Sequence, residues 1–366
     1  MKTFSNISTL ALAGLLAAAM FTVDASPMVQ QEAAAGCTLS GTYSNSNSIA
    51  SCANVLISNL NVPAGVTLDL TKVKNGATIT FAGTTTFGTK AWAGPLVLLT
   101  GENLKVSGTG TLDGQGAWYW KQGTKIARPV FFRLSHVDKS TLSAFTLKNS
   151  PSRTFSILHS TDTTLTKLTL DSRAGDGIAK NTDGFDLSNN FGVSILNNII
   201  INQDDCLAMQ SSTKTTFVGN SCTGGHGISI GSLGGDVTDA SDTVSGLNVT
   251  DNKIINNTNG LRIKTIVGLK GLVTGVHYVN NVLTNVKNAI VVHSDYSKAK
   301  GGYVGTPTSA VVIKDITISG LSGTATNIYD VLVNPSVVSG WKFSGITVKA
   351  SNKGSCKGQP RDITCA

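Results

Sequence analysis

Two aspartates and one histidine recur at nearly equal spacing along the chain. Asp183, Asp205 and His226 are separated by 22 and 21 residues, and each stands two positions ahead of an apolar–x–apolar triplet. A further carboxylate, Asp204, directly precedes Asp205. Carboxylates held close together cannot all ionise easily, so at least one is expected to have a raised pKa. A protonated carboxyl beside an ionised one is the arrangement that acid–base cleavage of a glycosidic bond requires.

Two cations follow this series in the next repeat. Arg262 and Lys264 flank Ile263, and residues two apart in a strand share a face. Paired Arg and Lys side chains suit a substrate that carries a carboxylate. Taken singly, an aspartate or His226 is better explained as a turn residue, and each cation as an ordinary solvated side chain. The whole set in register favours a catalytic site.

Short strands are the elements that must position these residues. Apolar and polar residues alternate in brief runs that Gly, Asn, Asp, Ser and Thr separate, which is typical of strands. The triplets recur at intervals of 22, 21, 33 and 29 residues, and they begin at Phe185, Leu207, Ile228, Leu261 and Ile290. A strand-only repeat of this length predicts an all-β parallel β-helix, or β-solenoid. Because adjacent parallel strands lie about 4.7–4.9 Å apart, Asp183, Asp205 and His226 are expected to form one column.

Two other all-β folds are the alternatives. A β-propeller needs blades of about 40–45 residues with a signature of their own. A β-sandwich gives no reason for acid–base residues to recur in register. We therefore predict one parallel β-helix domain over residues 37–366.

The N-terminus has the features of a secretion signal. Lys2 supplies a positive charge, an apolar run extends from Leu10 to Val23, and a small residue, Ala25, ends the segment. The run is shorter than the roughly 20 apolar residues that cross a membrane. We expect residues 1–25 to be a signal peptide, residues 26–36 to be a leader or propeptide, and the mature protein to be soluble, extracellular and not membrane-bound.

Cysteines and sequons agree with an extracellular location. Six cysteines allow 15 pairings, and proximity favours three local disulfides: Cys37–Cys52, Cys206–Cys222 and Cys356–Cys365. A zinc site is less well supported, because the chain has no C-x-x-C and no histidine at ligand spacing beside the cysteines. Asn248 and Asn256 head two sequons and are candidate glycosylation sites.

The net charge restricts the partners without choosing one. Lys and Arg number 29 against 21 Asp and Glu, a formal charge of +8. This balance permits nucleic acid, an anionic surface or an acidic polymer. The cations are scattered rather than clustered, which argues against nucleic acid.

At these residues the chain resembles the polygalacturonases of glycoside hydrolase family 28. The match rests on four blocks in the family's order and on a late tyrosine block, and it extends from about Cys37 to Cys365. The blocks are Asn181-Thr-Asp-Gly-Phe-Asp186, Gln203-Asp-Asp-Cys206, Gly225-His-Gly227, Arg262-Ile-Lys264 and Ser294-Asp-Tyr296.

The resemblance implies a role for each residue. Asp204 would be the general acid, Asp183 and Asp205 would hold and activate the attacking water, and His226 would tune the proton state of the acid. Arg262 and Lys264 would bind a galacturonate carboxylate, Tyr296 would position the sugar and Asn181 would support the column.

The resemblance also implies the reaction and the partners. A right-handed parallel β-helix would hydrolyse the α-1,4 bonds of polygalacturonate, the de-esterified form of pectin, with inversion and without a metal or other cofactor. Endo attack is preferred, because no long insertion is expected to block a subsite. The expected partners are pectin and polygalacturonase-inhibiting proteins, and the expected state is a monomer. His293, Ser294, Gln210 and Ser212 depart from the usual family residues, which bears on subsite preference.

Two other functions remain open on the sequence. A pectate or pectin lyase shares the fold and the polymer, but it uses a basic proton abstractor and often calcium, which the three aspartates argue against. A secreted protein that binds acidic polysaccharide without cutting it would suit the charge and the Arg262/Lys264 pair. Such a protein would be expected to have lost a carboxylate or His226, and all of them are present.

Overall fold

The computed structural model describes residues 37–44 and 47–365 of the chain, and short strands dominate them. In β8 (Phe132–Asp138) the side chains of Phe132 and Leu134 are buried, whereas Arg133 between them is partly exposed. This period of two sends alternate side chains into the interior and out to solvent. The predicted all-β class is therefore confirmed.

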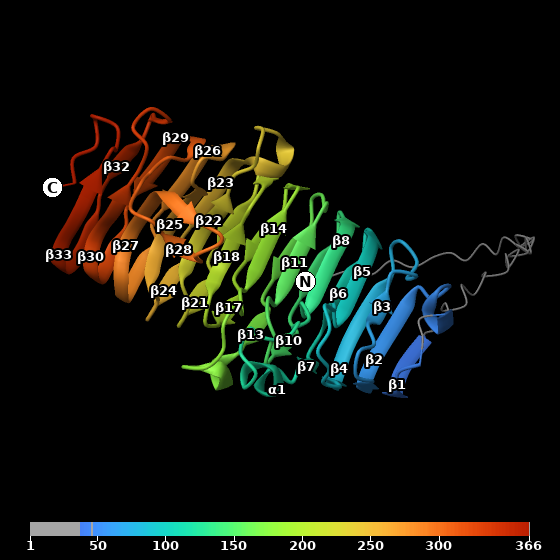
Figure 1. The fold of residues 1–366 in the computed structure, drawn as a ribbon. Helices are drawn as coiled ribbons and strands as arrows, with labels where there is room; N and C mark the ends of the chain where they lie inside the picture. Colours follow the sequence, from blue (N-terminus) through green and yellow to red (C-terminus); the bar gives the residue numbers. More distant parts are fainter. Residues whose placement is uncertain (1–36, 45–46, 366) are drawn as a thin grey trace, which may run out of the picture. The chain divides into compact units, whose positions relative to one another are not determined.

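The strands stack in parallel, coil upon coil, in three columns (Figure 1). The column that carries the candidate site is called the site sheet. It consists of β3 (Leu68–Leu70), β5 (Val97–Glu102), β8, β11 (Phe155–Leu158), β14 (Phe185–Ser188), β18 (Asp205–Met209), β22 (Gly227–Leu233), β25 (Asn259–Ile266), β27 (Val282–Ser297), β30 (Ser322–Leu332) and β33 (Thr347–Lys357).

The other two columns complete each coil. The second column consists of β1 (Cys37–Thr42), β2 (Asn54–Val62), β4 (Thr78–Phe87), β6 (Lys105–Gly108), β9 (Thr141–Ser143), β12 (Thr164–Thr166), β16 (Ser194–Leu196), β20 (Thr216–Val218), β23 (Thr243–Thr250), β26 (Lys270–Val279), β29 (Ala310–Ser319), β31 (Val338–Ser339) and β32 (Lys342–Ser344). The third column consists of β7 (Thr111–Asp113), β10 (Thr146–Lys148), β13 (Thr169–Asp171), β17 (Ile199–Ile201), β21 (Ser221–Thr223) and β24 (Lys253–Ile255), and it continues into the first part of β27.

Few elements lie outside these columns. They are β28 (Gly302–Tyr303), the five-residue α1 (Gly116–Trp120), and the 3-10 turns Asn47–Ile49, Arg173–Gly175 and Ala240–Asp242. The short strands β15 (Asn190–Phe191) and β19 (Ser212–Thr213) pair in parallel and join the second column at β23. The strand β28 pairs with β27 in the antiparallel sense, whereas the pairs within the columns are parallel. The protein is thus a right-handed parallel β-helix, as predicted.

Apolar side chains that recur in register fill the interior. The rings of Phe132, Phe155 and Phe185 stack along the site sheet at centroid distances of 5.4 and 5.3 Å. Each ring is fully buried. Stacked burial of this kind stabilises every coil against its neighbours, which is how a solenoid acquires a continuous core.

Four buried asparagines form a second stack, the asparagine ladder, at a corner of the coils. Asn198 donates to Asn220 Oδ1 at 2.9 Å, Asn220 to Asn252 at 3.2 Å, and Asn252 to Asn281 at 3.0 Å. Each of the four side-chain amides also donates to a backbone carbonyl. In Asn220, Asn252 and Asn281 the amide oxygen additionally accepts a backbone N–H. The polar atoms in the middle of the ladder are therefore satisfied without a charge.

The three predicted disulfides are present, linking Cys37 to Cys52, Cys206 to Cys222, and Cys356 to Cys365. The sequon residues Asn248 and Asn256 are both exposed, and their glycosylation stays a prediction. The predicted signal and leader segments, residues 1–25 and 26–36, lie outside the described residues. Among the residues that are described, no helix has the length and apolar character needed to cross a membrane.

Candidate active site

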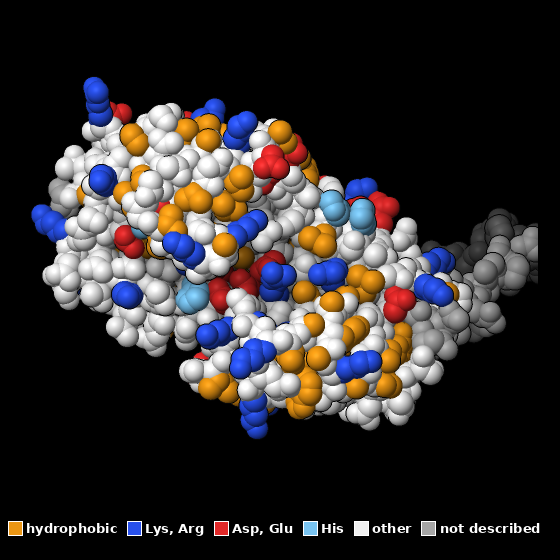
Figure 2. All heavy atoms as spheres, viewed as in Figure 1, with side chains coloured by type: hydrophobic (Ala, Val, Ile, Leu, Met, Phe, Trp, Pro, Cys, Tyr) orange, Lys and Arg blue, Asp and Glu red, His pale blue; other side chains and the backbone are white. Residues whose placement is uncertain are grey.

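All eight predicted catalytic and substrate-binding side chains line one cleft on the outer face of the site sheet. Its volume is about 360 Å³. The eight are Asn181, Asp183, Asp204, Asp205, His226, Arg262, Lys264 and Tyr296. In Figure 2 acidic side chains lie in a depression at the middle of the visible face, and Lys and Arg side chains border it.

The register at the centre of the cleft differs from the predicted column by one residue. Asp183 and Asp205 hold equivalent positions, because Gly184 N–H donates to the Asp205 carbonyl and Phe185 pairs with Leu207. Between Asp205 and Leu207, however, the pairing with β22 shifts, and Asp205 aligns with Gly227. An extra residue in one strand is a β-bulge, which re-aims the side chains around it.

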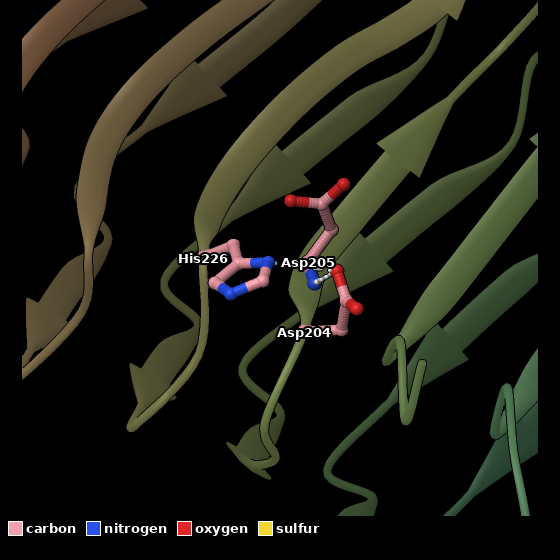
Figure 3. Close-up of side chains that lie close together, drawn as sticks. All are labelled: Asp204, Asp205 and His226. Carbon is pink, nitrogen blue, oxygen red and sulfur yellow. Dashed lines mark hydrogen bonds and ion pairs between the residues drawn. The ribbon is translucent and has the colours of Figure 1, made fainter. Parts of the chain in front are cut away.

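His226 consequently contacts Asp204, the acid whose proton state the resemblance gives it to tune, and does not align with Asp205 as the predicted column required. The His226 imidazole Nδ1 lies 2.9 Å from Asp204 Oδ1, and the His226 N–H donates to the Asp204 carbonyl at 2.8 Å. Figure 3 shows the imidazole turned toward the aspartates, with the carboxylates of Asp204 and Asp205 pointing in different directions. The expected single column was wrong in this detail, and the bulge is the physical reason.

Asp204 is the carboxylate that remains open to the cleft. Its side chain is 16% exposed. One oxygen accepts the Asp205 N–H at 2.9 Å, and the other accepts the Asn181 N–H at 3.2 Å. Asn181 adopts a left-handed backbone conformation with φ 58°, which asparagine tolerates better than most residues. This conformation fixes the carboxyl while leaving it accessible to a substrate.

Asp205 is held as a carboxylate by three partners. Lys264 Nζ lies 2.9 Å from one oxygen, and the other oxygen accepts from Ser229 Oγ at 2.8 Å and from Arg262. Burial by itself would raise the pKa of Asp205, but the Arg262 and Lys264 cations lower it to about 2. Asp205 thus favours the ionised form, and both of its oxygens already accept hydrogen bonds.

Asp183 has the opposite electrostatic environment. Burial raises its pKa well above the usual range, and repulsion from Asp186, Asp204 and Asp205 adds to the rise. The cluster therefore contains an anionic aspartate, Asp205, beside one that favours the protonated form, Asp183, so at least one pKa is raised, as the crowding of carboxylates predicted.

A fourth carboxylate, Asp186, was missed by the sequence analysis. It lines the same cleft and forms an ion pair with Arg153 at 2.7 Å. Burial raises the pKa of Asp186 to about 7, against the lowering effect of Arg153. We call Asp183, Asp186, Asp204 and Asp205 together the acidic cluster.

The signal that could have found Asp186 is the middle position of the triplets. Asp186, Ala208, Ser229 and Arg262 pair in series along the site sheet, each between two buried apolar residues. The position two residues ahead of each triplet identifies Asp183 and Asp205. The middle position of each triplet forms a different outward column, which contains Asp186.

The cationic end of the cleft is supported by aromatic rings. Lys264 Nζ lies 5.6 Å from the centroid of the Tyr296 ring, and Tyr296 pairs with Tyr303 of β28. Tyr303 stacks on His293 with a centroid distance of 3.8 Å. His293, one of the residues unusual for the family, pairs with Lys264 in register.

His293 is also held between two carboxylates. Its Nδ1 lies 2.7 Å from Asp295 and its Nε2 3.0 Å from Asp330. Burial would lower the pKa of His293, but Asp330 and Asp295 raise it overall. His293, which differs from the usual family residue, thus adds buried contacts with two carboxylates beside the cationic end of the cleft.

The cluster can perform acid–base chemistry more readily than it can hold a metal. Ligand atoms of Asp204, Asp205 and His226 lie within 4.8 Å of one another. Two protein cations already neutralise Asp205 and would repel a metal ion placed beside it. The arrangement fits a polar substrate with an anionic group near Arg262 and Lys264.

Comparison with known proteins assigns this site to a family. Residues 52–365 match the profile described as "Glycosyl hydrolases family 28". The chain belongs to glycosyl hydrolase family 28. It is therefore a glycoside hydrolase, and the resemblance seen in the sequence is confirmed.

Individual family members are similar over almost the whole chain. Endopolygalacturonase I from Aspergillus oryzae is 40% identical over 374 residues, covering 99% of this chain and 100% of that protein. The solved structure of endopolygalacturonase I from Stereum purpureum, complexed with two galacturonate, is 29% identical with a TM-score of 0.67, over 88% of this chain and 100% of that one. The endo-xylogalacturonan hydrolase from Aspergillus tubingensis is 25% identical with a TM-score of 0.75, over 90% of this chain and 98% of that one.

Proposed function

We propose that this family 28 glycoside hydrolase is a secreted endopolygalacturonase that hydrolyses α-1,4 bonds of de-esterified polygalacturonate with inversion. The observation that carries the proposal is the single cleft that contains both the acidic cluster and the Arg262/Lys264 pair. The names of its similar family members support the same substrate. The three disulfides suit an extracellular location.

The roles proposed for the three aspartates are those that the family resemblance implies, and the environment of each bears on how it would act. Asp204, partly exposed and beside His226, donates the proton to the leaving glycosidic oxygen. Asp183 and Asp205, both buried, hold the attacking water, and Asp205, which favours the ionised form, accepts its proton as attack proceeds. Arg262 and Lys264 bind the carboxylate of the galacturonate beside the scissile bond, and Tyr296 positions that sugar.

Inversion follows from the partners of Asp205 rather than from the carboxyl spacing. Aspartates on neighbouring coils, about 4.8 Å apart along a sheet, would be nearer than the roughly 6.5–9.5 Å that usually accompanies inversion. Asp205, however, already accepts hydrogen bonds from Arg262, Lys264 and Ser229. A carboxylate so engaged is a weak nucleophile, so water attacks directly and no glycosyl-enzyme ester forms.

Endo attack is supported by the continuation of the cleft. A neighbouring cavity of about 580 Å³ shares Asn181, Asp204 and His226 with it, and another of about 450 Å³ shares Asn181 and Arg153. A groove extended in this way accommodates the interior of a polymer.

The test uses purified protein on de-esterified polygalacturonic acid, with Asp204→Asn as control. Reducing ends, viscosity and absorbance of unsaturated uronate are followed in the same tube. For the wild-type protein we expect new reducing ends and an early fall in viscosity, without new absorbance from unsaturated uronate. In Asp204→Asn we expect neither new reducing ends nor a fall in viscosity. New absorbance would indicate a lyase, and binding without either signal would indicate a non-catalytic polysaccharide-binding protein.

A further inference from the structure

A cavity of about 450 Å³ beside the catalytic cleft is lined by three arginines, Arg128, Arg133 and Arg153. It shares Arg153 and Asn181 with the cleft, so the two spaces adjoin. No acidic side chain is among the described residues that line it. The roles proposed above for the catalytic residues do not involve this cavity.

The cavity lies across the acidic cluster from Arg262. Arg133 belongs to the same outward column as Arg262, because Arg133 pairs with Ser156 and Ser156 with Asp186, from which the column continues to Arg262. Five strand-to-strand steps of about 4.8 Å separate the two arginines, roughly 24 Å in all. A polymer lying along the site sheet would therefore meet Arg262 on one side of the acidic cluster and Arg133 on the other.

Two of the three arginines are already engaged by the protein. Arg153 pairs with Asp186. Arg128 donates to the Lys180 carbonyl at 2.5 Å and to Asn181 Oδ1 at 2.7 Å. Arg128 thereby supports the residue that holds Asp204, and it is a positioning residue.

Arg133 is the arginine with unused hydrogen-bonding capacity. Its buried Nε has no hydrogen-bond partner. Burial lowers the pKa of Arg133, and repulsion from Arg153 lowers it further. A buried donor without a partner is costly, and an anion bound beside the guanidinium would relieve the repulsion between Arg133 and Arg153.

We propose that this arginine-lined cavity binds the carboxylate of a uronate residue several sugars from the scissile bond, on the side opposite Arg262 and Lys264. The planar guanidinium of Arg133 matches a carboxylate through two parallel hydrogen bonds. The inference rests on the proposed function and extends it, because it makes recognition depend on the length of the uronate chain.

The experiment compares trigalacturonate with heptagalacturonate. Three hexose units are shorter than the roughly 24 Å between Arg133 and Arg262, whereas seven can extend from one to the other. The quantity measured is the ratio of kcat/KM for the heptamer to kcat/KM for the trimer. Arg133→Gln removes the charge, Arg133→Lys retains it without the planar fork, and Arg361→Gln removes an exposed charge that does not line the cavity.

We expect Arg133→Gln to lower this ratio about tenfold, as the loss of one charge-assisted hydrogen-bonded contact implies. Arg133→Lys should have a smaller effect, and Arg361→Gln should leave the ratio at the wild-type value. In a heptamer labelled at its reducing end, the preferred cleavage position should also shift in Arg133→Gln. Thermal unfolding of each variant verifies that it is folded.

The two levels of the proposal fail differently. A wild-type enzyme that cleaves both oligomers, together with an Arg133→Gln variant of unchanged ratio and cleavage position, overturns the arginine cavity alone. A wild-type enzyme that cleaves neither oligomer nor the polymer overturns the proposed function itself.

Discussion

Two stacks of polar side chains run along this β-helix, and they are built in opposite ways. In the asparagine ladder, neutral amides satisfy one another and the backbone from coil to coil. In the acidic cluster, four carboxylates crowd together, burial raises the pKa of two of them, and Asp186 Oδ1 has no hydrogen-bond partner. The same coil-to-coil repeat therefore supports both a stabilising stack and a strained reactive one.

The difference lies in what a neighbour in the next coil does to the group. An amide offers both donors and acceptors, so each added rung satisfies the last. A carboxylate offers only acceptors when ionised, so each added rung repels the last unless a proton or a cation intervenes. Polar residues in register are therefore evidence of a reactive site when they are charged and of a corner of the fold when they are amides.

The largest expected effect is a loss of catalytic activity when a residue of the acidic cluster is changed. Asp204→Asn keeps the size of the side chain but removes the proton donor, and we expect kcat on polygalacturonate to fall about 10³-fold. The thermal midpoint and binding of the polymer should stay near the wild-type values. Retention of substantial activity in Asp204→Asn would assign the general acid to another residue.

The reciprocal effect is on stability. Asn220→Ala leaves buried donors of Asn198 without an acceptor, and we expect a loss of about 3 kcal/mol in the free energy of unfolding. Urea denaturation measures this loss. The control Asn54→Ala, at an exposed position, should change the free energy by less than about 0.5 kcal/mol. Equal losses of unfolding free energy in Asn220→Ala and Asn54→Ala would show that the hydrogen bonds of the ladder do not stabilise the fold.

The third expected effect is the pH dependence of stability. Because the pKa of Asp186 is raised to about 7 in the folded state, the folded protein binds more protons than the unfolded chain between about pH 4 and 7. The free energy of unfolding should therefore fall as pH rises through that window, by up to about 1.4 kcal/mol per pH unit for this group.

Two variants sharpen this test. Asp186→Asn should flatten the decline, whereas Asn220→Ala should shift the whole curve by a constant amount because amides do not titrate. Urea denaturation at pH 4, 5.5 and 7 measures both. A slope in Asp186→Asn as steep as in the wild type would contradict the raised pKa.

The smallest expected effect concerns substrate binding at the cationic end. Lys264→Gln should raise KM for polygalacturonate about tenfold at low salt, since one charge-assisted contact is lost. Because Lys264 is only 8% exposed, salt should screen this contact little, and the difference from wild type should persist at high salt. Initial rates over a range of polymer concentrations measure this, with Lys349→Gln, an exposed site, as control. Equal KM values for Lys264→Gln and wild type would remove Lys264 from substrate binding.

Much of the fold and the site could be predicted from spacing alone. The alternation within strands and the recurrence of triplets follow directly from burial of every second side chain. They placed Asp183 and Asp205 in one column, and Arg262 and Lys264 together on one face. Spacing could not predict that His226 aligns with Asp204, because a bulge between Asp205 and Leu207 changes the register by one residue without altering the spacing of the triplets.

Other features depend on contacts between distant coils. The asparagines of the ladder are common turn residues, and their stacking appears only when coils of unequal length are superposed. The exposure of Asp204 and the engagement of Asp205 depend on Asn181, Ser229 and Lys264, which three different coils supply. Single-residue properties therefore predicted which side chains gather, whereas the division of roles required the structure.

The most direct test of the central claim is the stereochemistry of the first product. Proton NMR in D₂O, recorded during the first minutes of hydrolysis of an oligogalacturonate, resolves the anomer released before mutarotation. The account predicts the β anomer, because water held by Asp183 and Asp205 attacks the α-linked sugar directly. Initial release of the α anomer would demonstrate a covalent glycosyl-enzyme intermediate and would contradict the roles assigned to both aspartates.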